Sequence, residues 1–132
     1  MLAVISPAKK LDFETLPHYS NFSQPAFLDR SEILVKKAKS LSRAELGRTM
    51  HISDKLSDLN YRRFQNFSTP FTMENAKQAA LVFNGDTYLG LEAATLKSAD
   101  LDFAQEHLRI LSGLYGLLSP LDLIQPYRLE MG

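Results

Sequence analysis

Three short segments hold the polar and ionisable side chains best placed to bind a ligand, and each segment follows a run of apolar residues. These segments are 6–10 (SPAKK), 84–88 (NGDTY) and 112–116 (SGLYG). Together they supply hydroxyls, backbone amides exposed by glycine, an ammonium group, a carboxylate and two phenols. If the apolar runs are parallel strands, the three segments meet at one edge of a sheet, where ligands collect. This set of groups suits a small polar ligand that carries a phosphate or a ribose.

The residues predicted to bind this anionic or nucleotide-like ligand are Ser6, Lys9, Asp86, Tyr88, Ser112, Gly113, Tyr115, Gly116 and Arg128. A structural interpretation of the last segment stays open beside this prediction. Gly113 and Gly116 would then allow a helix and a strand to pack closely, and Tyr115 would fill the core. The two glycines match neither the GxGxxG pattern nor the Walker loop.

The sequence assigns no catalytic residue, and an enzymatic activity is not the favoured interpretation. Ser112-Gly113 lacks the residues that precede the serine of a nucleophile elbow. The three histidines lie far apart, the HExxH motif is absent, and the chain has no cysteine. We therefore predict neither a metal site nor a cofactor.

A second group of candidates lies in the basic segment 31–67, which is predicted to be helical. Positions 30–63 hold 9 basic and 4 acidic residues. Such an excess is typical of a solvated helical face, but it also suits a helix-hairpin-helix-like element that binds DNA phosphates. The junction at 51–54 (HISD) lacks the Gly-x-Gly usual in that motif. The candidate DNA-binding residues are Lys36, Lys37, Lys39, Arg43, Arg48, Lys55, Arg62 and Arg63.

Hydrophobic patterning places these segments on expected elements. Buried strands are expected at 2–5 and 80–83, a buried strand or a strand-to-loop junction at 111–118, and a long loop at 12–29. Helices are expected from 31 to about 40, from 43 after a capping box formed by Ser42 and Glu45, and over 54–67 after the cap Ser53. Two more are expected at 73–79 and 101–110. This order predicts a mixed α/β fold: a small sheet of about three buried strands with four or five helices.

Composition limits the broad class of protein. The 132 residues include 15 basic and 15 acidic side chains, and 45% are hydrophobic. These values indicate one globular domain, and they exclude a chain that is basic throughout or a disordered acidic tail. The N-terminus has neither a secretion signal nor a membrane span. We therefore expect a cytoplasmic protein that does not enter the membrane.

Several segments of the sequence resemble the YaaA family of bacterial peroxide-stress proteins. The resemblance lies in 5–12 (ISPAKKLD), 52–56 (ISDKL), 83–91 (FNGDTYLGL) and 102–118, and it continues through 120–122, 126–128 and 129–132. Lys10 stands where the family commonly has threonine. The resemblance implies a cytosolic protein that limits unincorporated iron and oxidative damage during hydrogen peroxide stress. It also implies a positively charged cleft and binding of double-stranded DNA.

Members of that family are about twice as long, so the chain resembles an N-terminal half, with residues 1–132 as a single domain. We then expect the apolar segment 111–123 to expose surface and to support self-association. Two functions stay open: a DNA-binding stress protein that uses the basic helices, and a binder or enzyme of a nucleoside-like molecule that uses the three loops.

Overall fold

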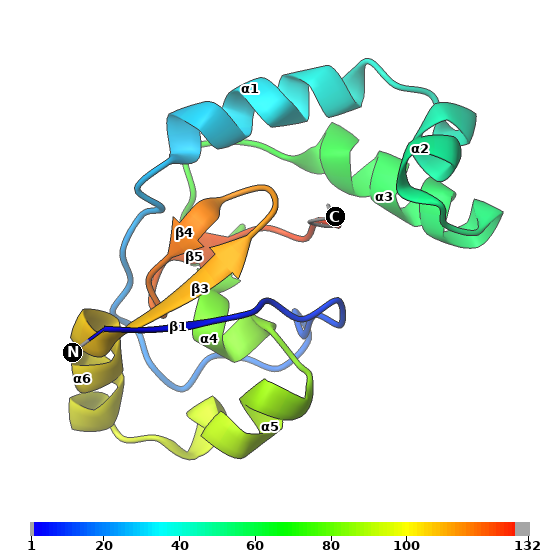
Figure 1. Ribbon diagram of the computed structural model, residues 1–132. Coiled ribbons are helices and arrows are strands. Elements are labelled where there is room, and N and C mark those ends of the chain that lie inside the picture. The colour runs from blue at the N-terminus through cyan, green and yellow to red at the C-terminus, as the bar shows by residue number, and fades with distance from the viewer. Residues whose placement is uncertain (1, 129–132) are drawn as a thin grey trace.

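A three-stranded mixed sheet lies at the centre of the molecule (Figure 1). The computed structural model describes residues 2–128, apart from the side chains at positions 86, 89 and 94. The strands are β1 (Ala3–Ile5), β3 (Leu108–Ser112) and β4 (Gly116–Leu118), in the order β1-β3-β4. β1 runs parallel to β3, with Ile5 opposite Ile110, and β3 pairs antiparallel with β4.

A second, antiparallel sheet consists of two strands of two residues each. Here β2 (Lys77–Gln78) pairs with β5 (Leu123–Ile124), and both strands are buried. Ser23 and Asp122 form an isolated bridge nearby, so part of the 12–27 segment is held against this ladder.

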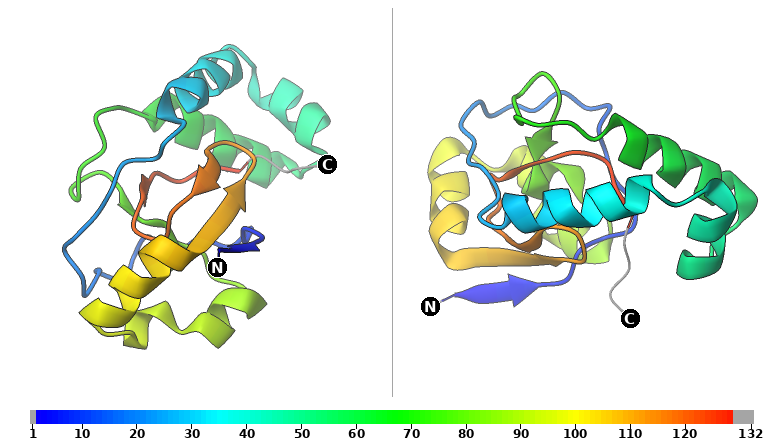
Figure 2. Two further views of the ribbon diagram at one scale, coloured as in Figure 1. Left: turned by 60° about the vertical axis from the view of Figure 1, so that its left-hand side comes forward. Right: turned by 90° about the horizontal axis from the view of Figure 1, so that it is seen from above.

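Three consecutive helices form an arm on one side of the sheet: α1 (Leu28–Lys39), α2 (Arg43–Met50) and α3 (Asp54–Asn66). Both figures show α2 and its junction with α3 at one end of the molecule and α6 (Ser98–His107) at the other (Figures 1 and 2). The short helices α4 (Ala79–Val82), α5 (Asp86–Leu91) and η1 (Ala93–Thr95) connect the second ladder to α6.

Local sequence signals account for the boundaries within the arm. The Ser42 side chain accepts a hydrogen bond from the Glu45 amide, and the Glu45 carboxylate accepts one from the Ser42 amide, which confirms the capping box. Ser53 caps α3 by accepting from the amide of Leu56. His51 ends α2 in the left-handed region with φ 55°. These caps satisfy backbone groups at the helix ends and fix a short turn between α2 and α3.

Aromatic residues join the arm to the sheet. Phe67 and Phe71 pack edge to face, and both rings contact Tyr115, which follows β3 and is fully buried. Tyr127 packs perpendicular to Tyr115 on its other side. Ile110 belongs to the same core, so sheet, arm and C-terminal segment share one apolar interior.

The mixed α/β fold is confirmed, but several predicted elements differ. The strand at 2–5 forms as β1, but it is an exposed edge strand rather than a buried one, because it pairs on one side only, with β3. Residues 80–83, expected as a strand, lie mostly in α4, because a run of four apolar residues cannot by itself distinguish a buried helical turn from a strand. The helix expected at 73–79 is instead a turn closed by Thr72 and Asn75, followed by β2. The three apolar runs therefore do not form three parallel strands.

The end of the chain also differs from expectation. The segment 111–118, expected as a strand or a strand-to-loop junction, forms the end of β3, a turn and β4, and the preceding helix ends at His107 rather than near 110. Leu114, Leu118, Leu121 and Leu123 are buried, and Leu111 is 40% exposed. The apolar surface expected along 111–123 is therefore largely internal, and self-association through it stays a prediction.

Candidate functional site

The first two predicted loops meet beside the carboxyl end of β1. The Tyr88 hydroxyl donates a hydrogen bond of 2.6 Å to the carbonyl of Ser6, and the Asn84 amide donates to the carbonyl of Lys10 at 2.9 Å. A side chain at Gly85 would meet the Ala8 methyl at 3.2 Å. The second loop reaches this edge although it follows a helix, because α4 and α5 fold back beside the 6–11 segment.

The third loop joins the same edge through a pair of hydroxyls. Ser112 Oγ and the Tyr127 hydroxyl are 2.7 Å apart, and Tyr127 lies close enough to Tyr88 to influence its ionisation. Burial, and then the neighbouring Tyr127, raises the pKa of Tyr88, and burial raises the pKa of Tyr127 against the opposing bond from Ser112. These phenols therefore stay neutral at physiological pH and act as hydrogen-bonding groups.

The glycine-rich segment itself forms the turn of the β3–β4 hairpin. Gly116 pairs with Ser112 and has φ 74°, and the Tyr115 amide donates to Ser112 Oγ at 3.0 Å. The Tyr115 hydroxyl donates to the Gln125 carbonyl and accepts from its amide. Turn geometry and core packing thus account for Gly116 and Tyr115. Gly113 begins the same turn.

The other predicted ligand residues occupy different surroundings. Lys9 lies exposed in the segment after β1, and Arg128 lies half-buried near Arg63. Asp86 begins α5, but its side chain lies outside the part of the chain that the structure describes.

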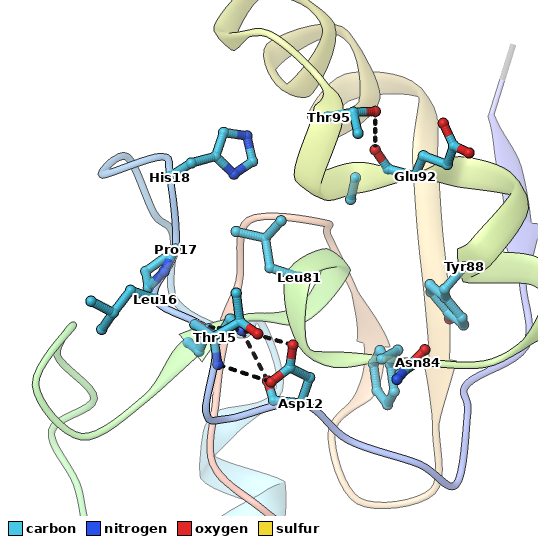
Figure 3. A pocket seen from close by; sticks show the side chains of 13 residues that line it. Asp12, Thr15, Leu16, Pro17, His18, Leu81, Asn84, Tyr88, Glu92 and Thr95 are labelled. Carbon is cyan, nitrogen blue, oxygen red and sulfur yellow. Dashed lines mark hydrogen bonds and ion pairs between the residues drawn. The ribbon is translucent and has the colours of Figure 1, made fainter.

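A pocket of ≈ 350 Å³ opens between the 12–18 loop and the α4–α5–η1 segment (Figure 3). Asp12 and Thr15 lie on one side, Glu92 and Thr95 lie on the other, and Leu81 projects between them. Asn84 and Tyr88 line the end of the pocket nearest the sheet edge. The pocket therefore adjoins the predicted loop cluster without including Ser6, Lys9 or Gly113.

Lys77 anchors the loop that forms one wall of this pocket. Its Nζ donates to the carbonyls of Asp12 (3.0 Å) and Thr15 (2.7 Å) and lies 3.9 Å from the Asp12 carboxylate. Only 5% of Lys77 is exposed, and this burial lowers its pKa against the pull of Asp12. The Asp12 carboxylate accepts from the amides of Glu14 and Thr15, and the Thr15 amide is the main cause of its lowered pKa.

Two carboxylates, Asp12 and Glu92, are among the polar groups that line the pocket. His18 Nε2 lies 2.9 Å from the Leu96 carbonyl and donates to it. Glu92 adds an exposed carboxylate, held on a backbone with φ 49°. The arrangement suits an apolar or aromatic ligand that bears hydrogen-bond donors. Sequence reasoning missed His18, Lys77 and Glu92 because no motif or spacing links them.

On the arm, several of the predicted DNA-binding arginines are engaged with one carboxylate. Asp58 lies 2.6 Å from Arg43 and 3.1 Å from Arg62. The Arg43 guanidinium also lies 4.1 Å above the Tyr61 ring. All three charged side chains are about half exposed, so these ion pairs contribute little to stability but reduce the local positive charge.

The remaining basic residues of the arm are more open. Lys36, Lys37, Arg48 and Lys55 are exposed or half-exposed. Lys37 and Arg48 lie on either side of Glu45, whose pKa is lowered first by its hydrogen bonds with Ser42 and then by these two cations.

Two more of the predicted residues contact backbone carbonyls, although Lys39 is exposed and Arg63 is half-buried. Lys39 donates to the carbonyl of Phe67 at 3.2 Å, and Arg63 Nη1 lies 3.5 Å from the carbonyl of Tyr127.

Within residues 2–128 the structure contains no helix long and apolar enough to cross a membrane. Among the described side chains, no cluster of three or more His, Cys, Asp or Glu could hold a metal ion.

The fold and these surfaces define a mixed α/β protein with a polar sheet edge at its centre and a basic helical hairpin at one end. The chain belongs to the family described as Peroxide stress protein YaaA, whose sequence profile matches residues 1–132. It is 60% identical to a UPF0246 protein of Pseudoalteromonas translucida, 58% to one of Dechloromonas aromatica and 54% to one of Burkholderia lata. Each match covers 100% of this chain and 51% of the relative. The chain thus spans about half the length of these relatives.

Proposed function

We propose that this protein acts in the cellular response to hydrogen peroxide in the cytoplasm and binds double-stranded DNA, without sequence preference, through the α1–α3 arm. The observation that carries the DNA-binding proposal is the compact α2–α3 hairpin at the end of the molecule. Gly47 on α2 lies so close to α3 that an added Cβ would stand 2.6 Å from Ser57 Oγ. The hairpin is thus a rigid unit that projects its turn and its basic residues outward.

The chemistry of the arm fits the DNA backbone better than the bases. Arg48 lies in the last turn of α2, and Lys55 lies in the first turn of α3. These two cations therefore flank the junction between the helices and are close together in the sequence. Lys36 and Lys37 extend this surface from the end of α1. Cations arranged in this way neutralise phosphates and release counterions, which gives sequence-independent and salt-dependent affinity.

Paired charge variants test the proposal. Arg48→Gln with Lys55→Gln should weaken binding of a labelled duplex roughly tenfold, because two phosphate contacts are lost. Arg30→Gln with Lys97→Gln removes the same charge from exposed positions at the far end of α1 and before α6, and should change affinity much less. Equal effects of the two pairs would show that net charge, rather than the hairpin, governs binding.

The proposed cellular role is to limit unincorporated iron and oxidative damage, with DNA binding placing the protein at a vulnerable target. Family membership supports the link to peroxide stress. In cells that lack the endogenous gene, the hairpin pair should restore survival under peroxide less well than the matched control pair, at equal protein abundance. Full restoration by the hairpin pair would separate peroxide protection from DNA binding.

The ≈ 350 Å³ pocket favours a second candidate function: binding of a nucleoside-like molecule through its amino groups. Support comes from the carboxylates of Glu92 and Asp12 beside the apolar side chain of Leu81. Calorimetric titration with adenosine, guanosine and cytidine should detect binding, and Glu92→Gln should reduce the affinity. Glu106→Gln, an exposed change on α6, is the matched control. Absence of heat with all three nucleosides would reject this candidate.

A further inference from the structure

Arg63 differs from the other basic residues of the arm because it is drawn toward the body of the protein. It lies on the side of α3 that faces the 125–128 segment, where its Nη1 is 3.5 Å from the carbonyl of Tyr127. Burial, and then the proximity of Arg128, lowers the pKa of its guanidinium. An arginine nevertheless remains protonated at physiological pH, so the fold holds a desolvated cation next to a second cation.

Arg63 borders two pockets. One also contains the carboxylates of Asp12 and Glu14. The other, of ≈ 390 Å³, lies between α3 and the segments that contain Ser68 and Pro126. Among the described residues that line this pocket, none is a carboxylate, whereas Arg62 adds a second guanidinium. Arg62 is partly paired with Asp58, at 3.1 Å.

Two neutral donors complete the lining. The Asn66 amide and the Ser68 hydroxyl both face this pocket, and neither makes a hydrogen bond to another side chain or backbone group in the part of the chain described here. Gln125, by contrast, is occupied by two hydrogen bonds with the backbone of Ser68. The pocket thus combines two guanidinium groups, an amide and a hydroxyl that can donate to one ligand.

We propose that this pocket binds a phosphate-type oxyanion, with Arg63 as the main contact and Arg62, Asn66 and Ser68 as additional donors. A bound oxyanion would offset the desolvation of Arg63 and its repulsion by Arg128. Guanidinium groups match phosphate oxygens in geometry as well as charge. The inference does not rest on DNA binding by the outer face of the arm, because the phosphate can belong to a small molecule or to a DNA backbone.

Two probes separate these sources: inorganic pyrophosphate, followed by calorimetry, and a labelled duplex, followed by anisotropy. Arg63→Gln should weaken binding of the relevant probe at least tenfold, the loss expected for a charge-assisted hydrogen bond. Arg30→Gln, an exposed change near the start of α1 and outside the pocket, should leave pyrophosphate affinity unchanged. Asn66→Asp is a second test that keeps the size of an exposed side chain and places a carboxylate in the pocket, so it should also weaken binding.

Each outcome decides the question. Loss of pyrophosphate binding in both variants supports a site for a small phosphorylated ligand. Weaker duplex binding in both variants, with no pyrophosphate binding by the parent protein, supports a site for a backbone phosphate. If Arg63→Gln fails to fold, Asn66→Asp alone carries the test. Unchanged affinity for both probes in the folded variants overturns the oxyanion site, while the effect of Arg48→Gln with Lys55→Gln on the duplex still tests the DNA-binding arm.

Discussion

Gly116 has a backbone conformation that L-residues with a Cβ rarely adopt, with φ 74° in the hairpin between β3 and β4. Gly116→Ala should destabilise the protein by about 1–2 kcal/mol, because the left-handed region is strained for alanine. A new Cβ would only reach ordinary contact with Phe27, at 3.4 Å, so the cost is conformational rather than steric. Urea denaturation measures the difference.

Asparagine is the control at this position, since it tolerates the left-handed region better than alanine does. Gly116→Asn should therefore cost less than Gly116→Ala although its side chain is larger. If the order were reversed, crowding against Phe27 rather than backbone conformation would explain why glycine is needed there.

Asp12 predicts a specific dependence of stability on pH. Its hydrogen bonds with the amides of Thr15 and Glu14 hold the folded-state pKa below the usual 3.8. The stabilisation by ionised Asp12 is therefore complete above the unfolded-state value and is lost as the pH falls through the lower folded-state value. The difference in unfolding free energy between the parent and Asp12→Asn should shrink from about pH 6 to about pH 3. A difference that stays constant over this range would contradict the assigned role.

The ion pairs on α3 lead to a prediction for the arm as an element. Asp58 pairs with both Arg43 and Arg62, so it offsets charge that would otherwise face a phosphate. Asp58→Asn should increase duplex affinity several-fold and steepen the salt dependence by about one unit, at a stability cost of at most about 1 kcal/mol. Glu106→Gln removes one negative charge on α6 and should have a much smaller effect. An unchanged affinity in Asp58→Asn would place both arginines outside the interface.

The close crossing of α2 and α3 is a second property of this element. Gly47→Ala should destabilise the hairpin by about 1 kcal/mol, because its Cβ displaces Ser57 Oγ and breaks the 2.8 Å bond from Ser57 to the Ser53 carbonyl. Gly47→Ala with Ser57→Ala should regain stability relative to the single variant. In the double variant the two side chains meet at Cβ, 3.6 Å apart, and alanine favours the helix. Thermal denaturation of both variants checks this order, and no recovery in the double variant would point to a different cause.

At the scale of the whole molecule, the sequence predicts elements well where local signals are strong. Ser42 and Ser53 are correctly predicted as caps because their hydrogen bonds lie within four residues of the chain. The 80–83 segment is predicted wrongly because its hydrophobicity reports burial rather than conformation. The pairing of the short β2 and β5 depends on contacts across more than forty residues, which no local pattern encodes.

The same distinction applies to the candidate sites. The predicted loops at Ser6 and Tyr88 are brought together, although the strand expected before the second loop is the helix α4. The pocket beside them depends on Lys77, a buried cation that carries no motif and reaches two carbonyls more than sixty residues away. Arg63 and Arg62 are neighbours in the sequence, yet only the fold separates an inward-facing side chain from an exposed one.

We propose that the basic arm, rather than the sheet edge or α6, is the surface that binds DNA. Titrating a short duplex into the isotope-labelled protein and following backbone amide resonances tests this claim directly. We predict that the largest chemical-shift changes lie between residues 36 and 56, around the end of α1, α2 and the turn before α3, while α6 and β1 stay unchanged. Changes concentrated in α6 or along β1, with the α2–α3 turn unaffected, would contradict it.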